Sequence, residues 1–84
     1  MHFASLKKSA RLRRTLDVLD RREGQWLTTR DLIVEAHICA VNSVIAELRA
    51  NGCEIECEQQ TAETGERRWA YRLKSAPEGW RKAA

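Results

Sequence analysis

Apolar residues recur at helical spacing in three stretches of the first 52 residues. The first stretch begins at Ser5 or Ser9 and ends near residue 23, and its leucines at positions 12, 16 and 19 share one helical face. Gly24 follows and predicts the helix C-terminus, because glycine accepts the left-handed conformation of a cap. The other faces of this helix carry the seven Lys and Arg residues of positions 1–22.

The second stretch is short and begins at Thr28. The Thr28 hydroxyl can cap the free N–H groups at a helix start, and Asp31, three residues further on, completes a capping box. Leu32, Ile33 and Ala36 predict its inward face. Residues 37–39 predict a turn, with Ile38 as an apolar plug between two helices.

The third helical stretch runs from residue 40 to residue 51. Its apolar residues repeat at 0, 3, 4 and 7 from Val41, which is one buried stripe, and Gly52 ends the helix by supplying a left-handed position. The residues left facing outward are Ala40, Asn42, Ser43, Ala46, Glu47, Arg49 and Ala50.

After Gly52 the apolar period changes to two, which is typical of β-strands. Cys53, Ile55 and Cys57 alternate with glutamates, and Trp69, Tyr71 and Leu73 alternate with Arg68, Ala70 and Arg72 on a return strand. Residues 60–66 predict an exposed loop between them. Glu56 and Glu58 are expected to lie across from Arg68 or Arg72. Trp26 is a candidate for a third, short strand.

Helix, turn, helix and two-stranded ribbon together predict an α+β fold: a winged helix-turn-helix with a three-helix core and a C-terminal two-stranded β-hairpin wing. We expect residues 1–74 to form this domain and residues 75–84 a tail. Trp80 in the tail is expected to fold back on the core, to help a dimer form or to meet nucleic acid. The predicted core consists of Leu12, Leu16, Leu19, Leu27, Leu32, Ile33, Ala36, Ile38, Val41, Val44, Ile45, Leu48, Ile55, Trp69, Tyr71 and Leu73.

Length and charge narrow the function classes. Eighty-four residues suffice for one domain with one small core. The net charge is +3, but residues 1–22 and 64–84 are basic, whereas residues 23–63 hold eight acidic residues against two arginines. Two basic ends around an acidic middle favour a polyanionic partner. No apolar stretch approaches the roughly 20 residues that span a bilayer, and no secretory segment is seen, so we expect a cytoplasmic protein without a membrane partner.

The cysteines and histidines favour neither a metal site nor an enzyme. Cys39, Cys53 and Cys57 are odd in number and unevenly spaced, which favours reduced thiols. Cys53 and Cys57 lie about 13 Å apart along one strand, too far to clamp a metal together, so we expect both to be packed inside. The chain has no nucleophile elbow, phosphate-cradling Gly-rich loop or His-Glu-x-x-His run, and we expect His37 at the surface of the turn. No cofactor, metal or small-molecule substrate is expected.

One segment resembles a known family. Residues 38–52, Ile-Cys-Ala-Val-Asn-Ser-Val-Ile-Ala-Glu-Leu-Arg-Ala-Asn-Gly, resemble the second helix of winged helix-turn-helix regulators, including the ending Leu-Arg-Ala-x-Gly before a strand. Over about residues 10–74 the chain is similar, more narrowly, to small phage and prophage helix-turn-helix proteins. The resemblance implies a small transcriptional regulator that binds double-stranded DNA, with the third helix in the major groove and with the wing and the basic first helix on phosphates.

Contact residues follow from this docking. The resemblance places Thr28, Thr29 and Arg30 on the DNA backbone, Asn42, Ser43 and Ala46 at the bases, and Arg67 and Arg68 on the wing. Ala40 lies on the same outward surface, and Lys7, Lys8 and Arg11 of the first helix are expected to reach phosphates. Asn suits an adenine edge, Ser donates or accepts, and Ala admits a thymine methyl.

Two features favour a different partner. The recognition surface has no Arg or Lys in its first two turns, and the first wing strand carries three Glu residues. The alternative is therefore a protein-interaction winged-helix module without DNA binding, using the acidic middle or Trp80. A homodimer is a further expectation, because one small winged helix reads few base pairs.

Overall fold

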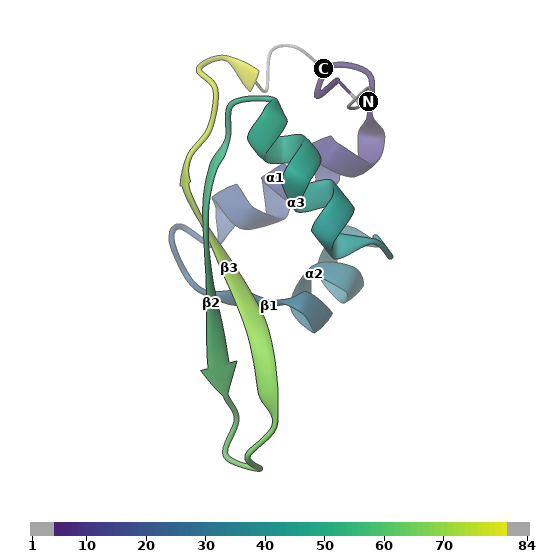
Figure 1. The fold of residues 1–84 in the computed structure, drawn as a ribbon. Coiled ribbons are helices and arrows are strands. Elements are labelled where there is room, and N and C mark those ends of the chain that lie inside the picture. Colours follow the sequence, from purple (N-terminus) through teal and green to yellow (C-terminus); the bar gives the residue numbers. More distant parts are fainter. Residues whose placement is uncertain (1–4, 81–84) are drawn as a thin grey trace.

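The computed structural model describes residues 5–80, which form three helices and a three-stranded antiparallel sheet (Figure 1). The elements are α1 (Ala10–Arg21), β1 (Leu27–Thr28), α2 (Thr29–Ala36), α3 (Val41–Ala50), β2 (Glu54–Thr61) and β3 (Arg67–Ser75). The class is α+β, as predicted, and the arrangement is compatible with a winged-helix layout. The prediction of two strands is wrong, because β1 adds a third, one residue after Trp26.

Helix α1 begins at the later of its two predicted starts, Ser9 and not Ser5. The Ser9 hydroxyl accepts a hydrogen bond from the Leu12 N–H at 3.4 Å and caps the helix. The helix ends at Arg21, two residues before the predicted end. The chain then turns through Glu23 and Gly24, which have φ values of 46° and 81°.

Helix α2 has the predicted capping box at its start. The Asp31 N–H donates to the Thr28 hydroxyl at 3.1 Å, and the Thr28 N–H donates to the Asp31 carboxylate at 2.9 Å. At the other end, His37 adopts the left-handed conformation with φ 55°. Its side chain is exposed, as expected of a residue in this turn.

Helix α3 ends in a Schellman motif. The N–H of Gly52 donates to the carbonyl of Arg49, and the N–H of Cys53 donates to the carbonyl of Leu48, each at 3.1 Å. Gly52 has φ 96°, which a side chain would strain, so the glycine is required by the geometry of this turn. The motif directs the chain from α3 into β2.

Strand β3 lies at the centre of the sheet, in the order β1-β3-β2. Glu56 lies opposite Arg72 and accepts a hydrogen bond from its Nε at 3.0 Å, as predicted. Glu58 lies opposite Ala70, so its expected pairing with an arginine is wrong. Ala70 was predicted on the outer face but is fully buried, because Thr28 on β1 and Glu58 on β2 flank it on both sides.

The core is one cluster, and thirteen of the sixteen residues predicted for it are buried. Leu73 is only partly buried. Ile33 is 40% exposed, because α2 buries a single row, Leu32 and Ala36, and Ile33 lies to the side of it. Trp69 is 50% exposed, because the hairpin of β2 and β3 extends past the helices (Figure 1). Buried residues outside the predicted core are Leu6, Thr15, Val18, Cys53 and Ala70.

The two ends of the hairpin differ in their surroundings. At the tip, the N–H of Ala62 donates to the backbone carbonyl of Glu66, and the N–H of Gly65 donates to the backbone carbonyl of Ala62, each at 2.8 Å, which closes a tight loop. At the base, β3 continues through Ser75, one residue beyond the predicted domain boundary. Beyond it, Ala76 and Trp80 pack against the core. The helical layer therefore covers only the base of the hairpin.

Candidate nucleic-acid interface

Arginines that the sequence places on the first helix are held by contacts within the protein. These contacts are Arg11 with Glu47, Arg13 with the carbonyls of Leu6 and Lys7, Arg14 with the carbonyls of Ala36 and His37, Arg21 with Asp17, and Arg22 with Glu35. Arg11 donates to both carboxylate oxygens of Glu47 at 2.8 Å, a bidentate pair between α1 and α3. A phosphate would have to compete with that carboxylate for Arg11.

Other cations have no such partner. Within residues 5–80, the side chains of Arg30, Arg67 and Arg68 make no ion pair or hydrogen bond, and neither do those of Lys7 and Lys8. The two lysines precede α1, at the end of the molecule opposite the hairpin tip (Figure 1). Arg30 on α2 and Arg68 on β3 line the same hollow. The structure therefore brings the three arginines to the hairpin side and leaves the lysines apart from them.

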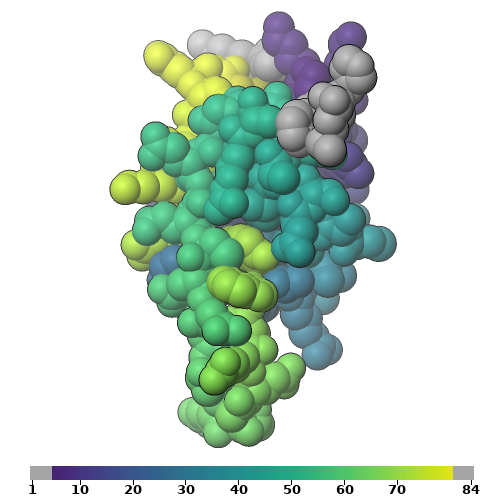
Figure 2. All heavy atoms as spheres, in the orientation of Figure 1, coloured from purple at the N-terminus to yellow at the C-terminus, as the bar shows by residue number. Residues whose placement is uncertain are grey.

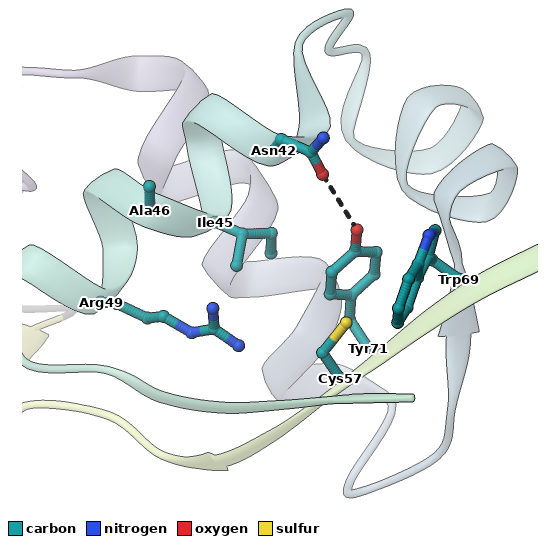
Figure 3. A pocket seen from close by; sticks show the side chains of 7 residues that line it. All are labelled: Asn42, Ile45, Ala46, Arg49, Cys57, Trp69 and Tyr71. Carbon is teal, nitrogen blue, oxygen red and sulfur yellow. Dashed lines mark hydrogen bonds between the residues drawn. The ribbon is translucent and has the colours of Figure 1, made fainter. Parts of the chain in front are cut away.

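Three open hollows meet at Trp69. One, of about 400 Å³, lies between α3 and the hairpin (Figure 3). The second, of about 430 Å³, adjoins the start of α3, and the third, of about 460 Å³, lies between the start of α2 and β3. Eight of the predicted contact residues line at least one of them: Thr28, Thr29, Arg30, Ala40, Asn42, Ser43, Ala46 and Arg68. We call these eight residues together with Trp69 the Trp69 surface. Figure 2 shows α3 and the hairpin side by side on one face of the molecule.

Asn42 is oriented by a residue of the sheet. The hydroxyl of Tyr71, which is 4% exposed, donates to Oδ1 of Asn42 at 3.2 Å (Figure 3). The side-chain amide nitrogen of Asn42 has no partner in the described part of the chain. Ser43 and Ala46 are exposed on the same side of α3. These three residues thus form an exposed polar and small surface, as the helical pattern predicted.

The start of α3 lacks a side-chain cap. Ala40 occupies the N-cap position and has no oxygen with which to accept a hydrogen bond from the first N–H groups. Such N–H groups are satisfied by water or by an anionic ligand. They lie next to Thr29 and Ser43 in the second hollow.

Several carboxylates of the acidic middle are paired with arginines. Glu47 binds Arg11, Glu35 binds Arg22 and Glu56 binds Arg72. The hydrogen bond from Arg72 lowers the pKa of Glu56, and the hydrogen bond to Glu35 raises the pKa of Arg22. Arg72 also lies over the ring of Trp26, 4.5 Å from its centroid. These pairs reduce the repulsion that the acidic middle would exert on a polyanion.

The cysteines divide into one buried and two exposed thiols. Burial raises the pKa of Cys53 to about 11, which keeps it a neutral thiol. Cys39 and Cys57 are exposed, so the expected burial of Cys57 is wrong. Cys57 borders the hollow between α3 and the hairpin, which the helices leave open. Among residues 5–80, no three His, Cys, Asp or Glu side chains are grouped to hold a metal, and no helix is long and apolar enough to cross a membrane.

The period-two pattern of β3 predicts that Trp69 lies in the core, but its side chain is exposed on the Trp69 surface. A signal for its exposure exists in its cross-strand partner. Leu73 and Tyr71 lie opposite Ile55 and Cys57, whereas Trp69 lies opposite Gln59. The apolar stripe of β2 ends one pair before Trp69, so this side chain lies beyond the edge of the core.

Comparison with protein families, with curated proteins and with solved structures found no match to this chain.

Proposed function

We propose that this chain is a non-enzymatic double-stranded DNA-binding protein, a winged helix-turn-helix transcriptional regulator of the small phage type. In this proposal α3 enters the major groove and the β2–β3 hairpin is the wing. One observation supports it most: eight predicted contact residues, from α2, α3, the N-caps of these two helices and β3, line hollows that share Trp69. Hydrogen-bonding side chains, small residues and unpaired arginines thereby form one continuous surface.

The residues divide by role. Asn42 and Ser43 carry sequence preference at base edges, while Ala46 lets the helix approach closely. Thr29 and Arg30 on α2 and Arg68 on β3 contact phosphates, which fixes the position of the protein without reading sequence. The basic first helix has a smaller role than the sequence implied, because Arg11 is paired with Glu47.

The unpaired arginines on the hairpin side predict how binding responds to salt. Arg30, Arg67 and Arg68 neutralise three phosphates per protomer in this arrangement. The logarithm of the association constant should then fall against log salt with a slope of about −3 per bound protomer, at about −0.9 per phosphate. A first helix lying on phosphates with all its cations would give a slope at least twice as steep.

The test is a titration with a fluorescein-labelled duplex. Anisotropy of a mixed-sequence duplex is measured at several salt concentrations, and selection from random duplex oligonucleotides then seeks a preferred site. Binding with a slope near the predicted value supports the proposal. Absence of binding at low salt, with a folded protein by circular dichroism, would contradict it.

A second candidate function is protein interaction without DNA binding. The observation in its favour is the apolar exposure on α2, where Ile33 is 40% and Val34 is 61% exposed. Exposed apolar side chains of this size can serve a protein contact. If the Trp69 surface binds DNA, Val34→Asp should leave duplex binding within about threefold of wild type. If the chain is a protein-interaction module, neither wild type nor Val34→Asp should bind duplex.

A further inference from the structure

Trp69 is a large aromatic side chain left half-exposed where the sheet leaves the helices. On one flank its cross-strand partner is Gln59, a polar residue. On the other flank β1 has already ended, because its last residue, Thr28, pairs with Ala70. The chain turns there into α2, so no β1 residue lies beside the indole. Tryptophan is buried to a high degree on average, so half exposure at such a position is informative.

The surroundings of Trp69 match a nucleic-acid backbone. The hollow between α2 and β3 is bordered by Arg30 on one side and by Arg68 and Glu66 on the other, with Ile33 and Trp69 as its apolar part. Its two arginines outnumber its one carboxylate. Neither arginine has a partner within residues 5–80. A sugar-phosphate backbone presents the complementary pattern, anionic phosphates on either side of an apolar deoxyribose.

The tip of the hairpin has the opposite character. Its loop carries Glu63 and Glu66, both exposed, and neither forms an ion pair in the described part of the chain. The two glutamates bring acidic side chains to the tip, and the tip carries no Lys or Arg between residues 62 and 66. The minor groove has a negative potential that attracts Arg, Lys and His. Two carboxylates at the tip therefore oppose its entry into that groove.

We infer that the hairpin meets the duplex with its flank, where the indole of Trp69 packs on the sugar-phosphate backbone between Arg30 and Arg68, and that the hairpin tip stays outside the DNA. This inference rests on the proposed function. Figure 3 shows that Trp69 lies beyond Tyr71 as seen from Arg49, on the side of the hairpin away from the C-terminal half of α3. In this arrangement Trp69 contacts the sugar-phosphate backbone of the DNA strand that borders the groove occupied by α3.

The first experiment compares two truncations of exposed apolar side chains. Trp69→Ala should weaken duplex binding by about tenfold or more, as truncation of an aromatic anchor does. Val34→Ala is the matched control, because Val34 is also exposed but lines none of the three hollows. It should bind as wild type does. Circular dichroism verifies that both variants fold.

The second experiment uses the fluorescence of Trp69 itself. In the double variant Trp26→Phe, Trp80→Phe, Trp69 is the remaining tryptophan, and its emission should shift to the blue and lose intensity when duplex is added. If that variant does not fold, the difference between wild type and Trp69→Phe gives the same measurement. Thr64→Trp, which places a bulky ring on the tip, should change the affinity by less than about twofold.

The outcomes separate the two proposals. A wild-type protein that binds no duplex overturns the proposed function and this inference with it. A wild-type protein that binds, with affinity unchanged by Trp69→Ala and emission of Trp69 unchanged by DNA, overturns the inference alone. A tenfold change of affinity in Thr64→Trp would likewise overturn it, since the tip would then lie in contact with the duplex.

Discussion

The hydroxyl of Tyr71, a core residue of β3, donates a hydrogen bond to the side-chain oxygen of Asn42 on the exposed side of α3. The sheet thereby orients the side chain that we assign to base reading. A base-contacting side chain that is already oriented binds more tightly than a mobile one, because less rotamer entropy is lost on binding, and it presents its hydrogen-bonding groups in one fixed direction. Through this bond Tyr71, a residue of the core, helps to position the side chain of Asn42 for contact with a base.

Tyr71→Phe tests this relationship. Loss of the hydroxyl should lower the free energy of unfolding by about 0.5–1.5 kcal/mol, the usual net contribution of one hydrogen bond. In duplex titrations it should reduce discrimination at the base position that Asn42 reads, in the same direction as Asn42→Ala, for which we expect a loss of about 1–3 kcal/mol. Ser43→Ala is the control for stability, because the Ser43 hydroxyl has no hydrogen bond within residues 5–80. Equal loss of affinity on every sequence would argue against base reading by Asn42.

Arg14→Met tests the link between α1 and the turn after α2. Arg14 donates to the carbonyls of Ala36 and His37 at 3.0 and 3.3 Å, so it satisfies backbone groups at the end of α2. The methionine keeps the apolar stem and loses the donors, and we expect a loss of about 1–2 kcal/mol in urea denaturation. Arg21→Met, which breaks an exposed pair with Asp17, should cost less than about 0.5 kcal/mol. Equal effects of the two changes would contradict a special role of Arg14.

Gly52→Ala tests the turn that ends α3. Gly52 has φ 96°, and a Cβ atom there would lie 3.3 Å from Cγ of Pro77. Gly24 has φ 81° with open space around it, so Gly24→Ala reports the backbone strain alone, about 1 kcal/mol. We expect Gly52→Ala to cost more than Gly24→Ala in thermal denaturation. The reverse order would show that Pro77 gives way without cost.

Cys53 predicts a loss of stability in alkaline solution. Its pKa is raised from an ordinary value near 9 to about 11, so between these values the unfolded chain has lost the thiol proton that the folded chain keeps. The contribution of the Cys53 thiol to the free energy of unfolding should therefore be fully present below pH 9. The free energy of unfolding should fall as the pH rises from 9 to 11. Denaturation of wild type and Cys53→Ala across this range measures the difference in slope. A thiol reagent should modify Cys39 and Cys57 quickly and Cys53 only on unfolding.

Arg11 and Arg68 should differ in their effect on the salt dependence of duplex binding. Arg68→Ala removes a free cation and should make the slope shallower by about 0.9. Arg11→Ala removes an arginine already paired with Glu47 and should leave the slope unchanged. Anisotropy titrations at several salt concentrations measure both. A shallower slope for Arg11→Ala would restore the first helix to the phosphate-contacting role that the sequence implied.

Local patterns in the sequence determine much of this fold. The apolar repeat from Val41 together with Gly52 predicts α3 and its end, and Thr28 with Asp31 predicts the start of α2, because caps and periodic stripes depend on residues a few positions apart. Strand β1 was harder to place from the sequence, because a strand of two residues is too short to show an alternation of apolar and polar positions. Its presence makes β3 a central strand, which is why Ala70 is buried.

The candidate site was predicted less completely, because its charges depend on contacts between distant residues. Arg11 and Glu47 are 36 positions apart, and no local pattern shows that they pair. The exposure of Trp69 required the register of β2 against β3, which places Gln59 opposite it. Asn42 was correctly placed on the exposed side of α3, but its bond to Tyr71 also depends on the fold.

The two ends of the described chain meet at the C-terminal end of α3. The N–H of Leu6 donates to the side chain of Asn51 at 3.0 Å, and Pro77 lies against Gly52. This corner is opposite the hairpin tip (Figure 1). An affinity tag, a fluorophore or a whole fusion partner attached before Ser5 or after Trp80 would thus join the domain at the pole remote from the hairpin tip. The protein can be immobilised or fused in tandem with the tip of the hairpin left open to solvent.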